Sequence, residues 1–267
     1  MASLSVDGAL LLTSADESSF APLFSDEWLG TELWPAAKVL AGHLEQQREA
    51  LGLANLLVVE LGAGTGACGL AAALLGSEEV LLTDKPSLLP SLERNARANG
   101  ACPSVRCAAL EWHSVATAGL GDEVPCGADL VLMSDCLNPV YGPNHASGLA
   151  WTLRALLSRR AETLSEHASE PLGLLAQTRR GRCEAEATFF AECERCQLRA
   201  TLIETVEIAT GSSTHEVDVA GVAAGDRRSC MDMVMDQSGM LDGARDRVDE
   251  ASAAAVVVGL YKIVLSR

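Results

Sequence analysis

The sequence predicts an α/β protein built on a mostly parallel sheet with helices on both faces. Three observations carry this prediction. Short apolar runs alternate with amphipathic stretches from residue 34 to about residue 196, a glycine-rich turn follows the first run, and two extended runs close the chain. Alternating strands and helices form parallel sheets, because each crossover helix packs back onto the sheet. The closing runs, 198–209 and 254–265, have no helix between them and predict a C-terminal antiparallel hairpin.

The first helix is predicted over 34–50, where Pro35 suits a first helical turn and Gly52 suits a helix stop. Five strands are predicted from apolar runs, at about 55–60, 79–83, 104–109, 129–134 and 172–177. The remaining helices are predicted at about 66–75, up to Asn99 after the second strand, at 144–160 and at 182–196. Pro90 must lie in the first turn of its helix or delay the start of that helix.

Length and composition limit the possible classes of protein. The chain has 267 residues, enough for one large α/β domain or two small ones, and is 48% hydrophobic but only 4% aromatic, so aliphatic side chains must fill its core. The net charge of −16 and the lack of an extended basic cluster argue against a nucleic-acid partner. The acidity suits a basic protein partner, or serves solubility alone.

The chain has no predicted membrane segment and no predicted metal site. Its short N-terminal apolar run lacks a preceding basic region, and no apolar run reaches about 18 residues. Nine scattered cysteines indicate thiols in a reducing, cytoplasmic setting, with the nucleus as an alternative. Cys193 and Cys196 form a CxxC, but they lie in an amphipathic pattern without a second pair at zinc spacing. We therefore expect helix-borne thiols there.

The predicted domain organisation is an N-terminal extension over 1–30 and one domain over 31–267. The segment 211–252 is rich in Gly, Ser, Asp and Arg and holds four of the six methionines. A long insert of this composition predicts a mobile loop, either disordered or a flap for docking a substrate, since methionine suits adaptable surfaces.

The glycine-rich turn predicts a cofactor site. Residues 58–69 read VVELGAGTGACG, so Glu60 ends an apolar run two residues before the first of three alternating glycines. Glycine lets the backbone approach a ligand closely. Asp84 follows 22 residues after Gly62, at the end of the next apolar run. Acids at two neighbouring strand ends beside such a turn suit a nucleoside with ribose hydroxyls.

The sequence indicates less directly which nucleoside cofactor is bound. Residues 64–69 spell GxGxxG, a weak indication of a nicotinamide dinucleotide. Two features favour S-adenosylmethionine instead. The glycines follow Glu60 as E-x-G-x-G-x-G, and the fourth strand ends in SDCLNPVY, which places polar groups and an aromatic at the carboxyl edge of the sheet.

Taken together, the motifs resemble those of the seven-strand protein-lysine methyltransferases typified by the enzyme that acts on valosin-containing protein. The resemblance covers about 32–158, and its residues occur in the family's order: the W-x-A-A helix beginning at Trp34, the glycine loop, LLTD ending at Asp84, the N-x-x-x-N at 95–99, the L-x-W at 110–112 and DLVLMSDC at 129–136. It implies a Rossmann-like class I methyltransferase fold and S-adenosylmethionine as the cofactor.

The resemblance also implies a set of cofactor-binding residues. Trp34 would lie near the methionine end, Asp84 would bind the ribose, and Trp112 would sit beside the adenine. The full expected set is Trp34, Glu60, Gly62, Ala63, Gly64, Thr65, Gly66, Asp84, Lys85, Trp112 and Ser134. For both tryptophans the alternative is core packing, and for Asp84 it is a helix cap.

The acceptor side departs from the family pattern. The family commonly has Asp-x-x-Tyr after the fourth strand, whereas here Asp135 is followed three residues later by Asn138, and Tyr141 comes later still. Asp135 could hold an incoming ammonium, Asn138 could accept a bond from the amine, and Tyr141 could form an aromatic wall for a methylated cation. These three are the predicted catalytic residues.

The predicted function is therefore protein-lysine N-methylation of a non-histone protein, with a basic protein, chaperone, ATPase or translation factor as the expected kind of partner. Two alternatives stay open. The first is methylation of another protein side chain or a small molecule, because the Asp-x-x-Tyr pattern is missing. The second is a non-catalytic acidic binding module on the same fold.

Overall fold

The structure is a computed structural model that describes Gly30 and residues 32–99, 104–124, 127–163, 169–209 and 255–266. The predicted N-terminal extension, apart from Gly30, and the predicted mobile insert at 211–252 lie outside the described residues. No helix among those described is long and apolar enough to cross a membrane.

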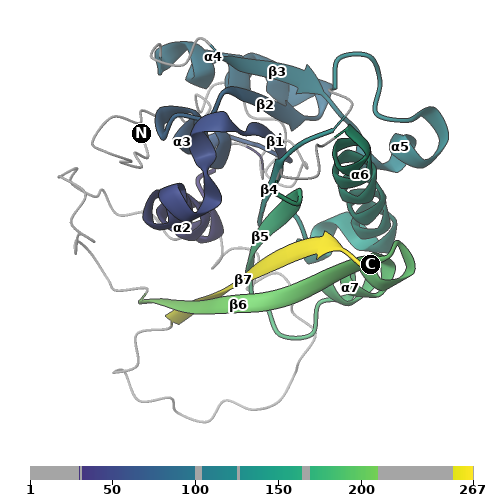
Figure 1. Cartoon of the computed structure of the whole chain (residues 1–267). Coiled ribbons are helices and arrows are strands. Elements are labelled where there is room, and N and C mark those ends of the chain that lie inside the picture. The colour runs from purple at the N-terminus through teal and green to yellow at the C-terminus, as the bar shows by residue number, and fades with distance from the viewer. Residues whose placement is uncertain are drawn as a thin grey trace.

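A seven-stranded sheet with the order β3-β2-β1-β4-β5-β7-β6 forms the centre of the molecule (Figure 1). Its strands are β1 (Leu57–Leu61), β2 (Glu79–Asp84), β3 (Val105–Ala109), β4 (Leu130–Ser134), β5 (Leu172–Thr178), β6 (Leu198–Ala209) and β7 (Ala255–Leu265). The first five are parallel, and β7 runs antiparallel to both β5 and β6. The predicted α/β fold with its C-terminal antiparallel hairpin is confirmed.

Two hydrophobic cores cover the two faces of this sheet. Neighbouring strand residues alternate between them: Val58 and Leu130 belong to one core, and Val59 and Val131 to the other. This alternation follows from the two-residue period of a strand. One face packs against α2 (Pro35–Leu51), α3 (Ala67–Leu74) and α4 (Leu89–Ala98), and the other against α5 (Trp112–Ala118), α6 (Gly142–Thr163) and α7 (Glu184–Arg195) (Figure 1).

The predicted helices and strands are found within a few residues of their expected positions, and Cys193 lies in α7 with Cys196 at its C-cap, both buried. The helix α5 was not predicted, because it is only one to two turns long and too short for a clear apolar period. A short 3₁₀ helix, η3 (Pro86–Leu88), precedes α4, so Pro90 falls at the start of that helix as expected.

The parallel strands bring their carboxyl ends to one edge of the sheet. Leu61 of β1 pairs with Thr83 of β2 on one side and with Met133 of β4 on the other. The residues that follow these three in sequence are Gly62, Asp84 and Ser134. Segments more than 20 residues apart in sequence therefore meet where open α/β sheets bind their ligands.

Candidate active site

A cavity of about 330 Å³ lies at this edge, within the size range of small-molecule sites. Thirteen of the fourteen predicted site residues line it: Trp34, Glu60, Gly62, Ala63, Gly64, Thr65, Asp84, Lys85, Trp112, Ser134, Asp135, Asn138 and Tyr141. Gly66 does not line it. A Cβ at Gly66 would lie 2.8 Å from Leu92 Cδ1, so this glycine allows the loop to pack against α4 and is not a wall of the cavity.

The glycine loop takes a backbone path that other residues cannot follow easily. Gly62 and Gly64 have φ values of +65° and +54°, where L side chains are strained. A Cβ would lie 3.0 Å from Trp112 Cζ2 at Gly62 and 2.8 Å from the Gly30 carbonyl oxygen at Gly64. The loop thus fits closely between neighbouring segments because these two positions carry no side chain.

Asn95 fixes the loop from behind. Its fully buried side chain donates from Nδ2 to the carbonyl oxygen of Thr65 at 2.9 Å. Asn99 Nδ2 in turn donates to the Asn95 carbonyl oxygen at 2.8 Å. The N-x-x-x-N pattern at 95–99 is therefore a support for the loop, a role that the sequence did not indicate.

Glu60 is the first of the two acids at the strand ends, and its carboxylate turns to the start of α3. Its Oε2 accepts a hydrogen bond from the Gly69 backbone N–H at 2.8 Å, near the positive end of that helix. Burial of the carboxyl group raises its pKa to about 7. Glu60 borders the cavity and also stabilises the helix that follows the loop.

Asp84 is the second acid, and it joins the loop to the end of β2. Its Oδ2 accepts from the Gly64 N–H and its Oδ1 from the Lys85 N–H, both at 2.7 Å. Burial raises its pKa above the usual value, against these two bonds. An ionised carboxylate has about four acceptor positions, so two backbone donors leave capacity for the hydroxyl groups of a ligand.

Aromatic rings form another wall of the cavity. The Trp112 and His145 ring centroids are 4.6 Å apart, and Tyr141 stacks on His145 with centroids 4.8 Å apart. Lys85 Nζ lies 5.7 Å from the Tyr141 ring centroid. Tyr141 therefore already faces a cation beside the strand end that carries Asp84. Its predicted role as an aromatic wall for a methylated amine stays a prediction.

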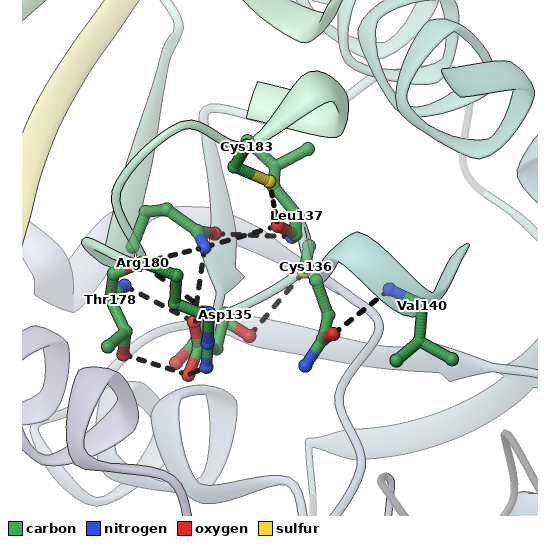
Figure 2. Close-up of polar contacts among 10 residues, drawn as sticks. Asp135, Cys136, Leu137, Val140, Thr178, Arg180 and Cys183 are labelled. Atoms are coloured by element: carbon green, nitrogen blue, oxygen red, sulfur yellow. Dashed lines mark hydrogen bonds and ion pairs between the residues drawn. The ribbon is translucent and has the colours of Figure 1, made fainter. Parts of the chain in front are cut away.

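Asp135 follows β4 with a φ of +54°, a region rare for residues other than glycine. Both of its carboxylate oxygens are engaged (Figure 2). Arg180 binds it in a bidentate pair at 2.7 and 2.8 Å, and Thr178 Oγ1 donates to Oδ2 at 2.9 Å. The predicted hold on an incoming ammonium would thus compete with a resident guanidinium.

Asn138 caps the short 3₁₀ helix η4 (Pro139–Tyr141). Its Oδ1 accepts from the Val140 N–H at 3.1 Å (Figure 2). The oxygen predicted to accept a bond from the amine therefore already has a backbone donor. Asn138 still lines the cavity, so its predicted catalytic role stays untested.

Two residues of this region escaped the sequence reasoning. His145 lines the cavity from the first turn of α6, and Arg180 binds Asp135 from beyond β5. In the sequence, Arg179 and Arg180 form no more than a short basic pair. No spacing rule connects position 180 with 135 or position 145 with 112, because tertiary packing alone brings them together.

The cavity suits a nucleoside ligand with an amino-acid arm. The loop leaves no room for a Cβ at Gly62 or Gly64, Asp84 keeps acceptor capacity, and Trp112, with its indole Nε1, belongs to the lining. That donor is buried and has no hydrogen-bond partner among the described residues. A buried polar group without a partner is costly, so a ligand that brought an acceptor within reach of this Nε1–H would remove that cost.

Comparison with solved structures first defines the fold. The fold is similar to that of a putative RNA methyltransferase from Pyrococcus horikoshii, with a TM-score of 0.54 and 13% sequence identity over 94% of both chains. At this identity the likeness concerns the fold alone. The mostly parallel seven-stranded sheet with its C-terminal antiparallel strands is that of a class I methyltransferase.

The sequence then defines the family. Residues 25–195 match the family described as lysine methyltransferase. The chain belongs to this family, as the resemblance found in the sequence predicted.

Curated relatives share shorter stretches with this chain. EEF1A lysine methyltransferase 3 of Xenopus tropicalis is 40% identical over 106 residues, which are 39% of this chain and 43% of the relative. Protein N-lysine methyltransferase METTL21A of the same species is 36% identical over 106 residues, or 39% and 48% of the two chains. The matches thus span less than half the length of these relatives.

Proposed function

We propose that this protein is an S-adenosylmethionine-dependent protein-lysine N-methyltransferase. The single observation that carries the proposal is the junction at the β2 end, where Asp84 accepts the Gly64 N–H at 2.7 Å and still has acceptor capacity. Membership of the lysine methyltransferase family supports the same conclusion. S-adenosylmethionine, when bound, supplies a methyl group that a neutral amine nitrogen takes while the C–S electron pair stays on sulfur.

The residues of this chain would divide the work of holding the cofactor. Asp84 would accept the ribose hydroxyls, and Trp112 would offer its Nε1–H near the base. The backbone of Gly62 and Gly64 would lie against the amino-acid arm, with Trp34 beyond it. Because the donor is already activated, the enzyme contributes chiefly alignment and exclusion of water.

We infer that the acceptor is a lysine of a non-histone protein. The name of one relative states that it acts on EEF1A, so a translation factor is the first substrate to test. The net charge of −16 suits a basic partner surface.

Calorimetric titration with S-adenosylmethionine, S-adenosylhomocysteine and NAD tests the cofactor. We expect micromolar binding of the first two and none of NAD, with at least a roughly hundredfold loss in Asp84→Ala, because two hydrogen bonds to a charged acceptor are worth about 3 kcal/mol or more. Asp122→Ala, which removes an exposed carboxylate, is the matched control. Binding of NAD alone would contradict the proposal.

Transfer of a labelled methyl group to a cell extract and to purified EEF1A tests the acceptor. We expect the label in a protein band and, after hydrolysis, in methyl-lysine. Label in another residue or in a small molecule would support the first alternative function. Cofactor binding without any transfer would support a binding module.

A further inference from the structure

The carboxylate of Asp135 is saturated by donors from one neighbouring segment. Oδ1 receives Gln177 Nε2 at 3.2 Å, the Thr178 N–H at 3.2 Å and Arg180 at 2.7 Å, and Oδ2 receives Thr178 Oγ1 at 2.9 Å and Arg180 at 2.8 Å. These five bonds exceed the roughly four acceptor positions of a carboxylate. Asp135 can bind an ammonium only if one of these donors leaves.

Arg180 is the charged member of this set and is held in place on both sides. Its side chain is 15% exposed and that of Asp135 only 3%. The guanidinium carbon also lies 5.9 Å from the Trp34 ring centroid, within cation–π range. Trp34 and Asp135 both line the cavity. The ion pair therefore lies directly behind the part of the cavity lining that Trp34 and Asp135 form. On the proposed function, this is the end of the cavity where the methyl group would be transferred.

Other charges near this pair do not replace it. Glu186 of α7 interacts electrostatically with both Asp135 and Arg180, but its pKa is raised by burial and it also contacts Arg179 and Tyr261. Glu60 and Asp84 line the cavity from β1 and β2 and bind backbone N–H groups. Within the described part of the chain, Arg180 is thus the cation in direct contact with Asp135.

We propose that Arg180 is a positioning residue that keeps Asp135 neutralised, so that the site admits an acceptor amine in its uncharged, nucleophilic form. An unpaired carboxylate here would stabilise the ammonium, which has no lone pair to take a methyl group. The bidentate pair removes that attraction and holds the β4 exit against β5. This inference rests on the proposed function, because it assumes that an amine approaches a cofactor in this cavity.

Sinefungin and S-adenosylhomocysteine test the inference without any substrate. Sinefungin carries a primary amine where the donor carries its methyl group, whereas S-adenosylhomocysteine carries nothing there. The ratio of their dissociation constants at one pH therefore reports how the site treats an amine at the transfer position. Dividing by the S-adenosylhomocysteine affinity cancels general damage to the cofactor site.

Variants at the pair should move this ratio in opposite directions. In Arg180→Gln the unpaired Asp135 should tighten sinefungin relative to S-adenosylhomocysteine by about tenfold, the size of a single charge interaction in a partly solvated site. In Asp135→Asn the remaining guanidinium should weaken sinefungin binding, relative to S-adenosylhomocysteine binding, by about threefold or more. Arg180→Lys and the double variant Asp135→Asn with Arg180→Gln should stay within about twofold of the wild type.

Arg179→Gln is the matched control, because it removes the same charge from an exposed neighbour that makes no bond to Asp135. It should leave the ratio unchanged. Equal ratios in all variants, or shifts of the same sign in Arg180→Gln and Asp135→Asn, would overturn the inference while leaving the proposed function intact. A wild-type protein that binds neither probe would overturn both. If Arg180→Gln fails to fold, the ratio in Asp135→Asn decides the question alone.

Discussion

The two buried aspartates at the carboxyl ends of β2 and β4 have opposite surroundings. Among the residues that the structure describes, Asp84 receives hydrogen bonds from backbone N–H groups, those of Gly64 and Lys85. Asp135 receives a guanidinium, a hydroxyl, an amide and a backbone N–H. The first carboxylate can still accept bonds from a ligand, and the second cannot without losing a partner. Similar residues after two strands of one sheet thus differ in how much acceptor capacity folding leaves to them.

This contrast teaches that a polar residue after a strand is not by itself a ligand group. What decides is whether its acceptor capacity remains after folding. The following changes test the contrast, from the largest expected effect to the smallest.

Asp135→Ala should mainly lower stability, whereas Asp84→Ala should mainly weaken cofactor binding. We expect Asp135→Ala to lower the free energy of unfolding by about 3–5 kcal/mol, because it leaves a mostly buried guanidinium without its partner. Asp84→Ala should cost no more than about 2 kcal/mol, because it removes a carboxylate that burial already penalises, yet it should abolish cofactor binding. Urea denaturation and calorimetry of both variants measure the two effects. Equal losses of stability would break the contrast.

Glu60→Gln should change how stability depends on pH. The folded-state pKa of Glu60 is raised from 4.5 to about 7, so its favourable contribution is complete below pH 4.5 and is lost as the pH rises through 7. The loss amounts to about 3 kcal/mol. The neutral glutamine keeps an acceptor for Gly69 and should not show this loss. Denaturation of both proteins between pH 4.5 and 8.5 measures the difference, and parallel curves would contradict the assignment.

Gly64→Ala should be worse than Gly121→Ala. Both glycines have positive φ, at +54° and +75°, but a Cβ at Gly64 would lie 2.8 Å from the Gly30 oxygen, whereas nothing lies within 4 Å at Gly121. Gly121→Ala should cost about 1 kcal/mol of backbone strain. Gly64→Ala should cost about 2 kcal/mol more through the overlap and weaken S-adenosylhomocysteine binding. Similar costs for the two variants would show that the loop is not tightly packed.

Asn138→Ala should have the smallest effect. It removes the Oδ1 acceptor for the Val140 N–H, and loss of such a cap costs about 1 kcal/mol. Asn138→Asp keeps an acceptor and should retain stability. If transfer of the methyl group falls equally in both variants while stability differs, Asn138 acts on the acceptor as well as capping the 3₁₀ helix.

The architecture was largely accessible from local patterns. Apolar runs and periodic stretches placed the five parallel strands, the two closing strands and, among the described residues, every α-helix except α5. The order β5-β7-β6 was not accessible, because either closing strand could pair beside β5. Nothing local to 198–209 or 255–265 states that the last strand lies between the other two.

The features of the candidate site also divide into those accessible from local sequence patterns and those that were not. The sequence by itself placed the glycine loop and Asp84 at the edge where the cavity lies, because strand ends and glycine turns are local features that parallel pairing brings to one edge. Trp112, which also lines the cavity, was expected there only from the family resemblance. Only the tertiary structure decided that Asp135 is bound by Arg180, that Tyr141 stacks on His145 and that Asn95 supports the loop. Hydrogen-bond capacity and ring packing depend on which distant side chains arrive at the same place, and a pattern of neighbours along the chain carries no record of that.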